Sequence, residues 1–307
     1  HNDNLEIMYT VDGQPVPDER VLHGWAGHKG SAPVRIGNGA RDQVQLDTAG
    51  ALLDAAYLYE QGASGALTFR VWRLLRRVVQ SVQRRWSEPD HGIWEPRHGM
   101  RHNVHSKLMS WLALDRGARL APRFGDLSSA HLWASTAAQV REDMCEKGLD
   151  PSKNHFVASY GTDHADAALL LVPIHGMLGP NDPRVTKTVD FVRDRLSSGP
   201  YIYRYKVDDG VGGEEGAFIL CGFWLAEALA MAGRLDEAHD VFSAHVAASN
   251  HVGLLAEEID PSTGGLLGNF PQAFSHLGLI KAAVRIDKGL RMRDEAPAGA
   301  ARPLRPL

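Results

Sequence analysis

The chain has 307 residues, of which 44% are hydrophobic and 23% are charged. This balance is typical of a soluble globular protein that buries a sizeable core. The formal net charge of -4, from 33 Lys and Arg against 37 Asp and Glu, argues against nucleic acid and anionic membranes as partners. A neutral ligand rich in hydroxyl groups suits such a chain.

The cysteine and hydropathy patterns give no sign of disulfide bonds or of a membrane-spanning segment. Cys145 and Cys221 are too few for a disulfide framework, and we expect buried free thiols in apolar helices. The most apolar window, residues 217–233, is short for a membrane span and contains Glu227. No secretory signal is evident in a sequence that begins at His1, and a cytoplasmic location is our expectation.

Residues 1–42 are expected to form a short strand followed by irregular loops. Leu5–Val11 alternates loosely and ends at Asp12-Gly13, which predicts a strand that enters a turn. From residue 43 onward, apolar residues recur at helical spacing and predict a helical domain over residues 43–290. The predicted helices cover residues 43–62, 65–86, 103–120, 126–146, 163–178, 184–196, 214–233, 235–249 and 270–287. The Ala/Pro/Arg-rich segment 291–307 is expected to be a disordered tail.

Consecutive helices without alternating strands indicate an all-α fold. A solenoid of helical hairpins requires a fixed repeat period, which these helices and loops do not keep. We therefore favour a closed toroid of antiparallel helices whose long loops gather at one end. The long loops at residues 87–101, 197–213 and 250–269 are where binding and catalytic groups are expected.

The first long loop places a carboxylate, Glu95, directly after the indole of Trp94. Aromatic faces stack on sugar rings, and an apolar ring disfavours the charged form of a neighbouring carboxyl, as a general acid requires. Basic side chains that can donate hydrogen bonds to sugar hydroxyls follow: Arg97, Arg101, His102, His105 and Lys107. The alternative is that Glu95 pairs with Arg97 and merely braces the loop.

The other two loops carry pairs of carboxylates with weaker signals. Glu257 and Glu258 follow an apolar run, so one of them could face a cavity, although adjacent glutamates are commonly a solvated pair. Glu214 and Glu215 precede an apolar helix, and either could complement its N-terminus.

A metal site is a rival interpretation of the histidines in the first loop. His98, His102 and His105 are close enough in sequence for two or three of them to share a metal ion. The His-Glu-x-x-His arrangement is absent, and Arg97 and Arg101 would add positive charge beside a cation. We therefore expect no metal and no cofactor.

Taken in order, the loops resemble glycoside hydrolase family 15, which contains glucoamylases, glucodextranases and bacterial or archaeal trehalases. The matching blocks are Pro33–Gln43, Gly92–Arg97, Arg101–Lys107, Trp111–Arg116, Asp208–Trp224, Ala256–Asp260 and Ser275–His276. The resemblance implies an (α/α)6 toroid and hydrolysis of α-glucosides with inversion of configuration. It also implies Glu95 as the general acid and Glu257, rather than Glu258, as the general base.

Further site residues are implied by the same resemblance. Trp94, Arg97 and Arg204 would help to form sugar-binding subsites. The matched blocks add four further substrate-binding candidates: Arg101, His105, Lys107 and Glu215. Because an inverting enzyme needs room for a water molecule, we expect the two catalytic carboxyl groups to be about 6.5–9.5 Å apart.

The resemblance favours trehalose as substrate, with malto- or isomalto-oligosaccharides next. The family's toroid has twelve helices, whereas about nine are predicted here, and the family's early Trp-x-Arg-Asp segment has no counterpart. We therefore expect a C-terminal catalytic portion whose partner is a missing N-terminal half or a second copy in a homo-oligomer. The alternatives are a non-catalytic helical scaffold and a carbohydrate-binding fragment that needs the missing half.

Overall fold

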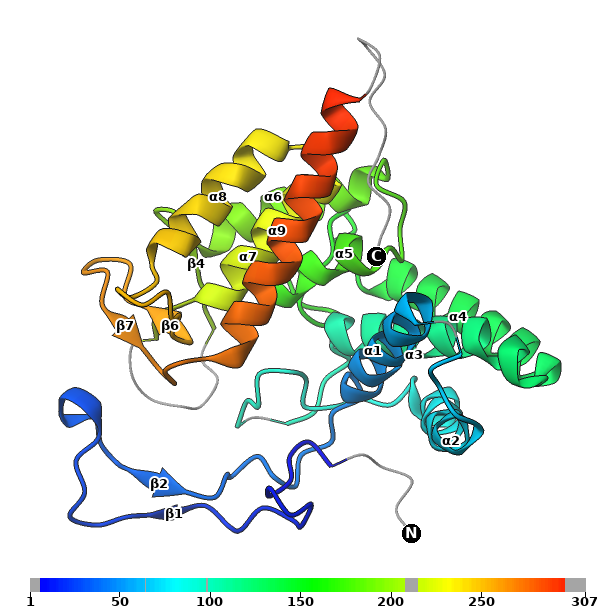
Figure 1. The fold of residues 1–307 in the computed structure, drawn as a ribbon, viewed down its shortest axis with the longest axis horizontal. Helices are drawn as coiled ribbons and strands as arrows, with labels where there is room; N and C mark the ends of the chain where they lie inside the picture. The colour runs from blue at the N-terminus through cyan, green and yellow to red at the C-terminus, as the bar shows by residue number, and fades with distance from the viewer. Residues whose placement is uncertain (1–5, 64, 98, 208–214, 296–307) are drawn as a thin grey trace. The chain divides into compact units, whose positions relative to one another are not determined.

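The computed structural model describes residues 6–63, 65–97, 99–207 and 215–295 (Figure 1). Within these residues the chain forms nine α-helices, and its strands have only two residues each. This confirms the predicted all-α class. The chain divides into two compact units, one of residues 1–140 with 209–211 and the other of residues 141–208 with 212–307. The domain boundaries predicted at residues 42 and 290 stay predictions.

The N-terminal segment has less regular structure than the sequence suggested. The predicted strand at residues 5–11 is reduced to a bridge between Tyr9 and Pro15, although the predicted turn is present at Gly13. The first regular strands are β1 (Arg20–Val21) and β2 (Arg35–Ile36), which pair antiparallel. A 3-10 turn, η1 (His28–Gly30), lies between them, and Figure 1 shows β1 and β2 as two extended segments that run side by side.

The helices of the first unit pack around α3 (Val104–Leu120), of which fourteen residues are buried. Helices α1 (Thr48–Gly62) and α2 (Phe69–Arg85) both pack against it. Gly117 allows close packing between α2 and α3, because a β-carbon there would lie 2.8 Å from the Val79 side chain. Trp133 of α4 (Leu127–Lys147) meets Trp72 of α2 edge to face. A short 3-10 helix, η2 (Ala121–Phe124), links α3 to α4.

Several predicted helices are shorter than their apolar spacing suggested, and the contacts of two of them show why. The helix predicted from residue 43 begins at Thr48, because Val44 and Leu46 donate their backbone N–H groups to His91 and Asp90 instead. The helix predicted over residues 163–178 is divided into η3 (Ala167–Leu170) and α5 (Leu171–His175). The carboxylate of Asp166 caps η3, and Gly176, in the left-handed conformation, ends α5.

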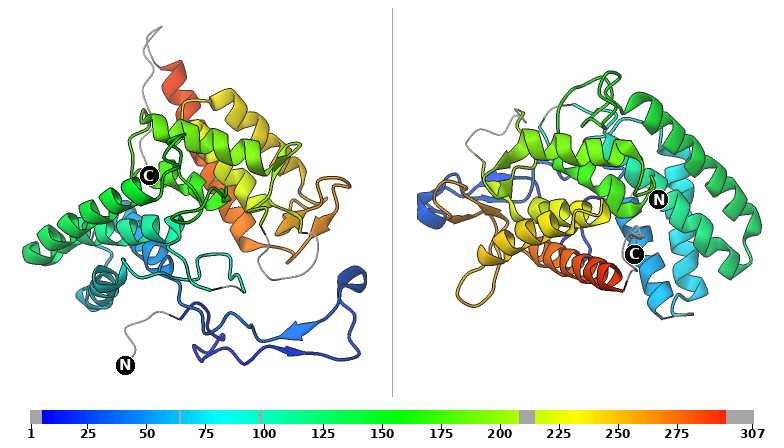
Figure 2. Two further views of the ribbon diagram at one scale, coloured as in Figure 1. Left: turned by 180° about the vertical axis from the view of Figure 1, so that it is seen from behind. Right: turned by 90° about the horizontal axis from the view of Figure 1, so that it is seen from above.

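The second unit is built around α7 (Ile219–Met231), which is buried on almost every side, as expected for a helix that is apolar all round. It packs against α8 (Leu235–Ala247) and α9 (Ala273–Asp294), and Figure 2 shows these three helices side by side. Gly222 leaves room for the ring of His245, which a β-carbon at this position would overlap. The unit also contains α6 (Pro183–Leu196).

Short strands lie at the N-terminal end of α7. Strands β5 (Ala217–Phe218), β6 (Glu258–Ile259) and β7 (Leu266–Leu267) form an antiparallel sheet in that order. In this sheet Phe218 is paired with Glu258. A second pair, β3 (Ser197–Ser198) and β4 (Tyr201–Ile202), follows α6. The three-stranded sheet therefore fixes the segment that contains the adjacent glutamates.

The C-terminal helix is longer than predicted, because α9 continues to Asp294. Its last turns contain an ion pair between Asp287 and Arg291, 2.8 Å apart and one helical turn from each other. Residues 296–307 of the predicted tail lie outside the described residues. Both cysteines are free thiols; Cys221 is buried in α7 and Cys145 is half-buried in α4. None of the helices in the described ranges is long and apolar enough to cross a membrane.

Candidate active site

The loop that carries Glu95 is closed at its base by backbone pairing. Asp90 and Arg101 exchange two backbone hydrogen bonds, of 2.8 and 2.9 Å. The buried carboxylate of Asp90 accepts hydrogen bonds from the Ser106 hydroxyl at 2.7 Å and from the Asn103 amide at 2.9 Å. This network ties the loop to the first turn of α3. The described residues of this loop, 91–97 and 99–100, therefore project from a fixed base.

Glu95 has a left-handed backbone, with φ of 53°. A residue with a β-carbon adopts this conformation at a cost of about 1–3 kcal/mol, and such outliers cluster at functional sites. Its side chain is half-buried, and its Oε2 accepts a hydrogen bond of 3.1 Å from the Asn38 amide. The loop thus holds the backbone of Glu95 in a conformation that a residue with a side chain does not favour.

Among the described residues of this unit, Arg97 forms an ion pair with Glu19 rather than with Glu95. Its guanidinium lies 3.2 Å from Glu19 Oε2, which also accepts the Gly39 N–H at 3.2 Å. The Gly39 N–H, followed by the charges of Arg97 and Arg35, lowers the pKa of Glu19. The loop brace that the sequence suggested is therefore formed with a residue from the N-terminal segment.

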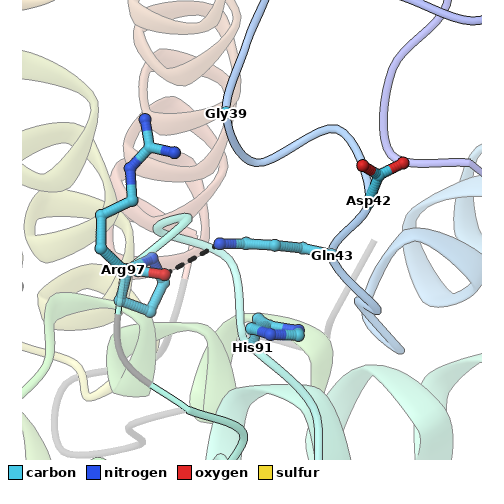
Figure 3. Close-up of a pocket in the computed structure, with 6 residues that line it drawn as sticks. Gly39, Asp42, Gln43, His91 and Arg97 are labelled. Atoms are coloured by element: carbon cyan, nitrogen blue, oxygen red, sulfur yellow. Dashed lines mark hydrogen bonds between the residues drawn. The ribbon is translucent and has the colours of Figure 1, made fainter. Parts of the chain in front are cut away.

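The first unit contains a pocket of about 280 Å³ (Figure 3), and part of its lining comes from the two residues that follow Glu95 in the sequence. It is lined by Gly39, Asp42, Gln43, His91, Pro96 and Arg97. Figure 3 shows the Gln43 side chain extended across the pocket, and its amide donates to the Pro96 carbonyl at 2.8 Å. The Arg97 guanidinium lies close to Gly39, and a β-carbon there would have to displace it. The lining offers hydrogen-bonding groups suited to a hydroxyl-rich ligand.

Two predicted substrate-binding residues are buried below the loop. The Lys107 ammonium donates to the carbonyls of Trp86 and Glu88, each at 2.6 Å, and its side chain is 1% exposed. His105 is 5% exposed, and burial lowers its pKa to about 4. Its Nδ1 lies 3.9 Å from Asp47, whose pKa is raised to about 7 by burial and by the charge of Asp90. These contacts indicate support of the loop, and a direct role in substrate binding stays a prediction.

Three further residues predicted in or beside the first loop differ in their exposure to solvent. Trp94 and His102 are half-buried, and Arg101 is exposed. His98, part of the rival metal interpretation, lies outside the described residues. Within the ranges that the structure describes, no group of three or more His, Cys, Asp or Glu side chains could hold a metal ion.

In the second unit, Glu257 is fixed on both its backbone and its carboxylate. Its backbone N–H donates to the Asn269 carbonyl at 2.9 Å, and its carbonyl accepts the Ile219 N–H at 3.0 Å. Its Oε2 accepts two hydrogen bonds of 2.9 Å, from the backbone N–H and the side-chain amide of Asn269. These two hydrogen bonds hold the Glu257 carboxylate in one position.

Glu258 has a different environment from its neighbour. Burial, and then the charges of Glu215 and Glu257, raise the pKa of Glu258 to about 7, although its Oε2 accepts the Gly216 N–H at 2.9 Å. The adjacent glutamates are therefore not an equivalent solvated pair.

Arg204 and Glu215, both predicted to bind substrate, are brought together in this unit. They form a two-pronged ion pair, in which Arg204 Nε lies 2.9 Å from Glu215 Oε2. The guanidinium also lies over the rings of Tyr205 and Phe218. Glu214 and the preceding acidic residues of the predicted cluster lie outside the described residues.

Comparison of the sequence with known protein families identifies the family of this chain. The model of glycosyl hydrolases family 15 matches residues 1–284. The chain belongs to this family. Among its relatives, the trehalase of Mycobacterium tuberculosis is 42% identical over 95% of this chain and 43% of its own length. The trehalase of Thermoplasma volcanium is 36% identical over 95% of this chain and 47% of its own length. This family 15 chain thus spans less than half the length of either trehalase.

Solved structures of glucoamylases support the same fold. Glucoamylase from Saccharomycopsis fibuligera matches 80% of this chain and 71% of its own, with a TM-score of 0.66 and 15% identity. A bacterial glucoamylase, solved in complex with acarbose, matches 83% of this chain and 44% of its own, with a TM-score of 0.67 and 15% identity. The likeness confirms the predicted helical fold class of the (α/α)6 enzymes.

Sequence reasoning missed three residues that contact the proposed site. Asn38 and Glu19 hydrogen-bond to Glu95 and Arg97 across 57 and 78 residues of sequence, and Asn269 contacts Glu257. Asn38 lies in the first block matched to family 15, and that match was the one available signal for it. No local pattern distinguishes Glu19 from an exposed surface glutamate.

Proposed function

We propose that this family 15 chain carries the two catalytic carboxylates of an inverting α-glucosidase, with trehalose as the favoured substrate. In this proposal Glu95 is the general acid and Glu257 is the general base. Support for the substrate comes from the identity of 42% to a trehalase across 95% of the chain. The proposed location is the cytoplasm.

The observation that carries the assignment of the base is the contrast between two adjacent glutamates. Glu257 accepts two N–H donors from Asn269, whereas the pKa of Glu258 is raised to about 7 by burial. The two hydrogen bonds from Asn269 hold the Glu257 carboxylate in a fixed position, which a base that must be aligned with an attacking water molecule requires. This contrast favours Glu257, in agreement with the family motif.

The proposed reaction is a single displacement. Protonated Glu95 donates its proton to the glycosidic oxygen while the bond from that oxygen to the anomeric carbon breaks. Ionised Glu257 removes a proton from a water molecule that attacks the anomeric carbon from the opposite face. The products are the leaving alcohol and a glucose of inverted configuration, and the two carboxyl groups exchange protonation states.

The test is glucose release from trehalose, maltose and isomaltose by the full chain and by E95Q, E257Q and E258Q. We expect trehalose to be hydrolysed fastest, and both E95Q and E257Q to lose at least about 100-fold in kcat. E258Q is the matched control, because it changes the adjacent carboxyl and keeps an oxygen for the Gly216 N–H; we expect it to retain hydrolysis.

The outcomes distinguish the catalytic hypothesis from the carbohydrate-binding and scaffold hypotheses. Unchanged hydrolysis in E95Q or E257Q would overturn that residue's assignment, and loss in E258Q alone would exchange the two glutamates. If the wild-type chain and E95Q bound trehalose equally but neither released glucose, the chain would be a carbohydrate-binding portion. Absence of both binding and hydrolysis would leave the scaffold interpretation.

A further inference from the structure

Asn38 is the residue whose side chain hydrogen-bonds to the proposed general acid. Its Nδ2 donates to Glu95 Oε2 at 3.1 Å. Its Oδ1 accepts the backbone N–H of Ala40 at 2.7 Å. Because a backbone N–H can bond only to the amide oxygen, this second contact fixes the orientation of the Asn38 amide and directs its NH2 group toward Glu95.

The segment that contains Asn38 holds the Glu95 loop at two further points. Gln43 donates to the carbonyl of Pro96 at 2.8 Å. The Gly39 N–H and the Arg97 guanidinium share Glu19 Oε2. Residues 38–43 therefore hold residues 95–97 in place, while the backbone of Glu95 keeps its left-handed conformation.

We propose that Asn38 is a positioning residue for the general acid and that it determines which carboxyl oxygen of Glu95 delivers the proton. This inference rests on the proposed function of Glu95. The Asn38 amide occupies Oε2, so Oε1 carries the proton that passes to the glycosidic oxygen. When that proton leaves, the pair of electrons from the O–H bond stays on Glu95, and the leaving alcohol gains the proton.

Proton donation strengthens the same contact. A hydrogen bond from an amide to a carboxylate is shorter and stronger than one to a neutral carboxyl group. The Asn38 contact therefore stabilises Glu95 more after proton transfer than before it. An interaction that strengthens along the reaction raises kcat rather than substrate affinity.

Two substitutions separate this role from a purely structural one. N38D keeps an oxygen for the Ala40 N–H but replaces the donor that faces Glu95 with a second carboxylate. N38A removes both contacts. The matched control is N250D, because Asn250 Oδ1 accepts the backbone N–H of Val252 two residues later, in the same kind of turn.

The experiment is the pH profile of trehalose hydrolysis by the full chain and these variants, with E95Q as reference. We expect N38D to lower kcat at least 10-fold with KM within about 2-fold, and to move the alkaline limb up by about one pH unit, because a like charge favours protonated Glu95. N38A should move the limb in the same direction by less, and N250D should match the wild type. The other charged groups near the loop are the same in all variants: Glu19, Arg35, Asp42, His91 and Arg97.

A second readout does not depend on turnover. The carboxyl carbon of Glu95, assigned by its loss in E95Q, is titrated by 13C NMR in the wild type, N38A and N38D. Protonation at a higher pH in N38D than in N38A, and lowest in the wild type, supports the proposal. Coincident titrations, or a defect in N38A with N38D at wild-type activity, would overturn it. Wild-type hydrolysis by E95Q would instead refute the role of Glu95.

Discussion

Gly268 lies directly against the carboxylate of Glu257. A β-carbon at Gly268 would be 2.8 Å from Glu257 Oε2 and 2.9 Å from the Glu257 β-carbon. Gly268 also has φ of 70° and immediately precedes Asn269, the donor of both hydrogen bonds to that oxygen. The position of the proposed base therefore depends on a residue without a side chain.

G268A is expected to damage activity more than stability. The added methyl group must displace the Glu257 carboxylate or Asn269, and a displacement near 1 Å can lower kcat about 10- to 100-fold. Substitution at positive φ also costs about 1–2 kcal/mol of folding free energy. Gly264 provides the control, because it has φ of 71° and nothing within 4 Å of an added β-carbon. Equal kcat in G268A and G264A, measured beside urea unfolding, would contradict this prediction.

Glu258 gives the second unit a pH-dependent stability that E258Q should remove. Its pKa of about 7 in the folded chain lies above its ordinary value of 4.5. The folded state therefore keeps a proton that the unfolded state has lost, and stability falls as pH rises between these values. One proton contributes at most about 1.4 kcal/mol per pH unit, and less here because the side chain is only half-buried.

The measurement is the free energy of unfolding in urea from pH 4.5 to 8 for the wild type and E258Q. Asp47, whose pKa is also raised to about 7, contributes equally to both proteins, so their difference isolates Glu258. We expect E258Q to gain stability relative to the wild type as pH rises from 4.5 to about 7, and the difference to level off above that pH. A difference that stays constant across this range would show that Glu258 does not titrate as described.

A buried ion pair joins α7 to α9. Glu227 and Arg285 lie 3.1 Å apart, with side chains 2% and 1% exposed. Removing one partner leaves the other charge buried, so E227L should destabilise the chain by about 3–5 kcal/mol. The double variant E227L/R285M should recover much of this loss, as measured by thermal and urea unfolding. A double variant no more stable than E227L would show that the guanidinium is not the cause.

The helices were predictable because their apolar periodicity is local. The spacing over residues 103–120 and 235–249 predicts helices that the structure places at Val104–Leu120 and Leu235–Ala247. Some of the errors occur where a distant segment supplies the hydrogen bonds. The helix predicted from residue 214 begins at Ile219, because Ala217 and Phe218 pair instead with β6, about forty residues later.

The candidate site was predictable only in part, for the same reason. Glu95 and Glu257 follow recognisable motifs, so the sequence indicates them. The contacts that distinguish Glu257 from Glu258 come from Asn269 and Gly216, which local spacing does not place. Lys107 is a second case, because its place beside the matched motif predicts a role in sugar binding, but local spacing does not show that its ammonium donates to two backbone carbonyls.

The stereochemistry of the released glucose tests the proposed pair of roles most directly. Attack by water on the face opposite the leaving group converts an α-glucoside into β-glucose, whereas a retaining enzyme would release α-glucose. For maltose, we expect 1H NMR spectra recorded within the first minutes of hydrolysis to show β-glucose in excess of its equilibrium share. For trehalose, the leaving sugar keeps its α configuration, so α- and β-glucose should appear in equal amounts before mutarotation. Initial release of α-glucose alone would exclude a single displacement and, with it, the role of Glu257 as a base.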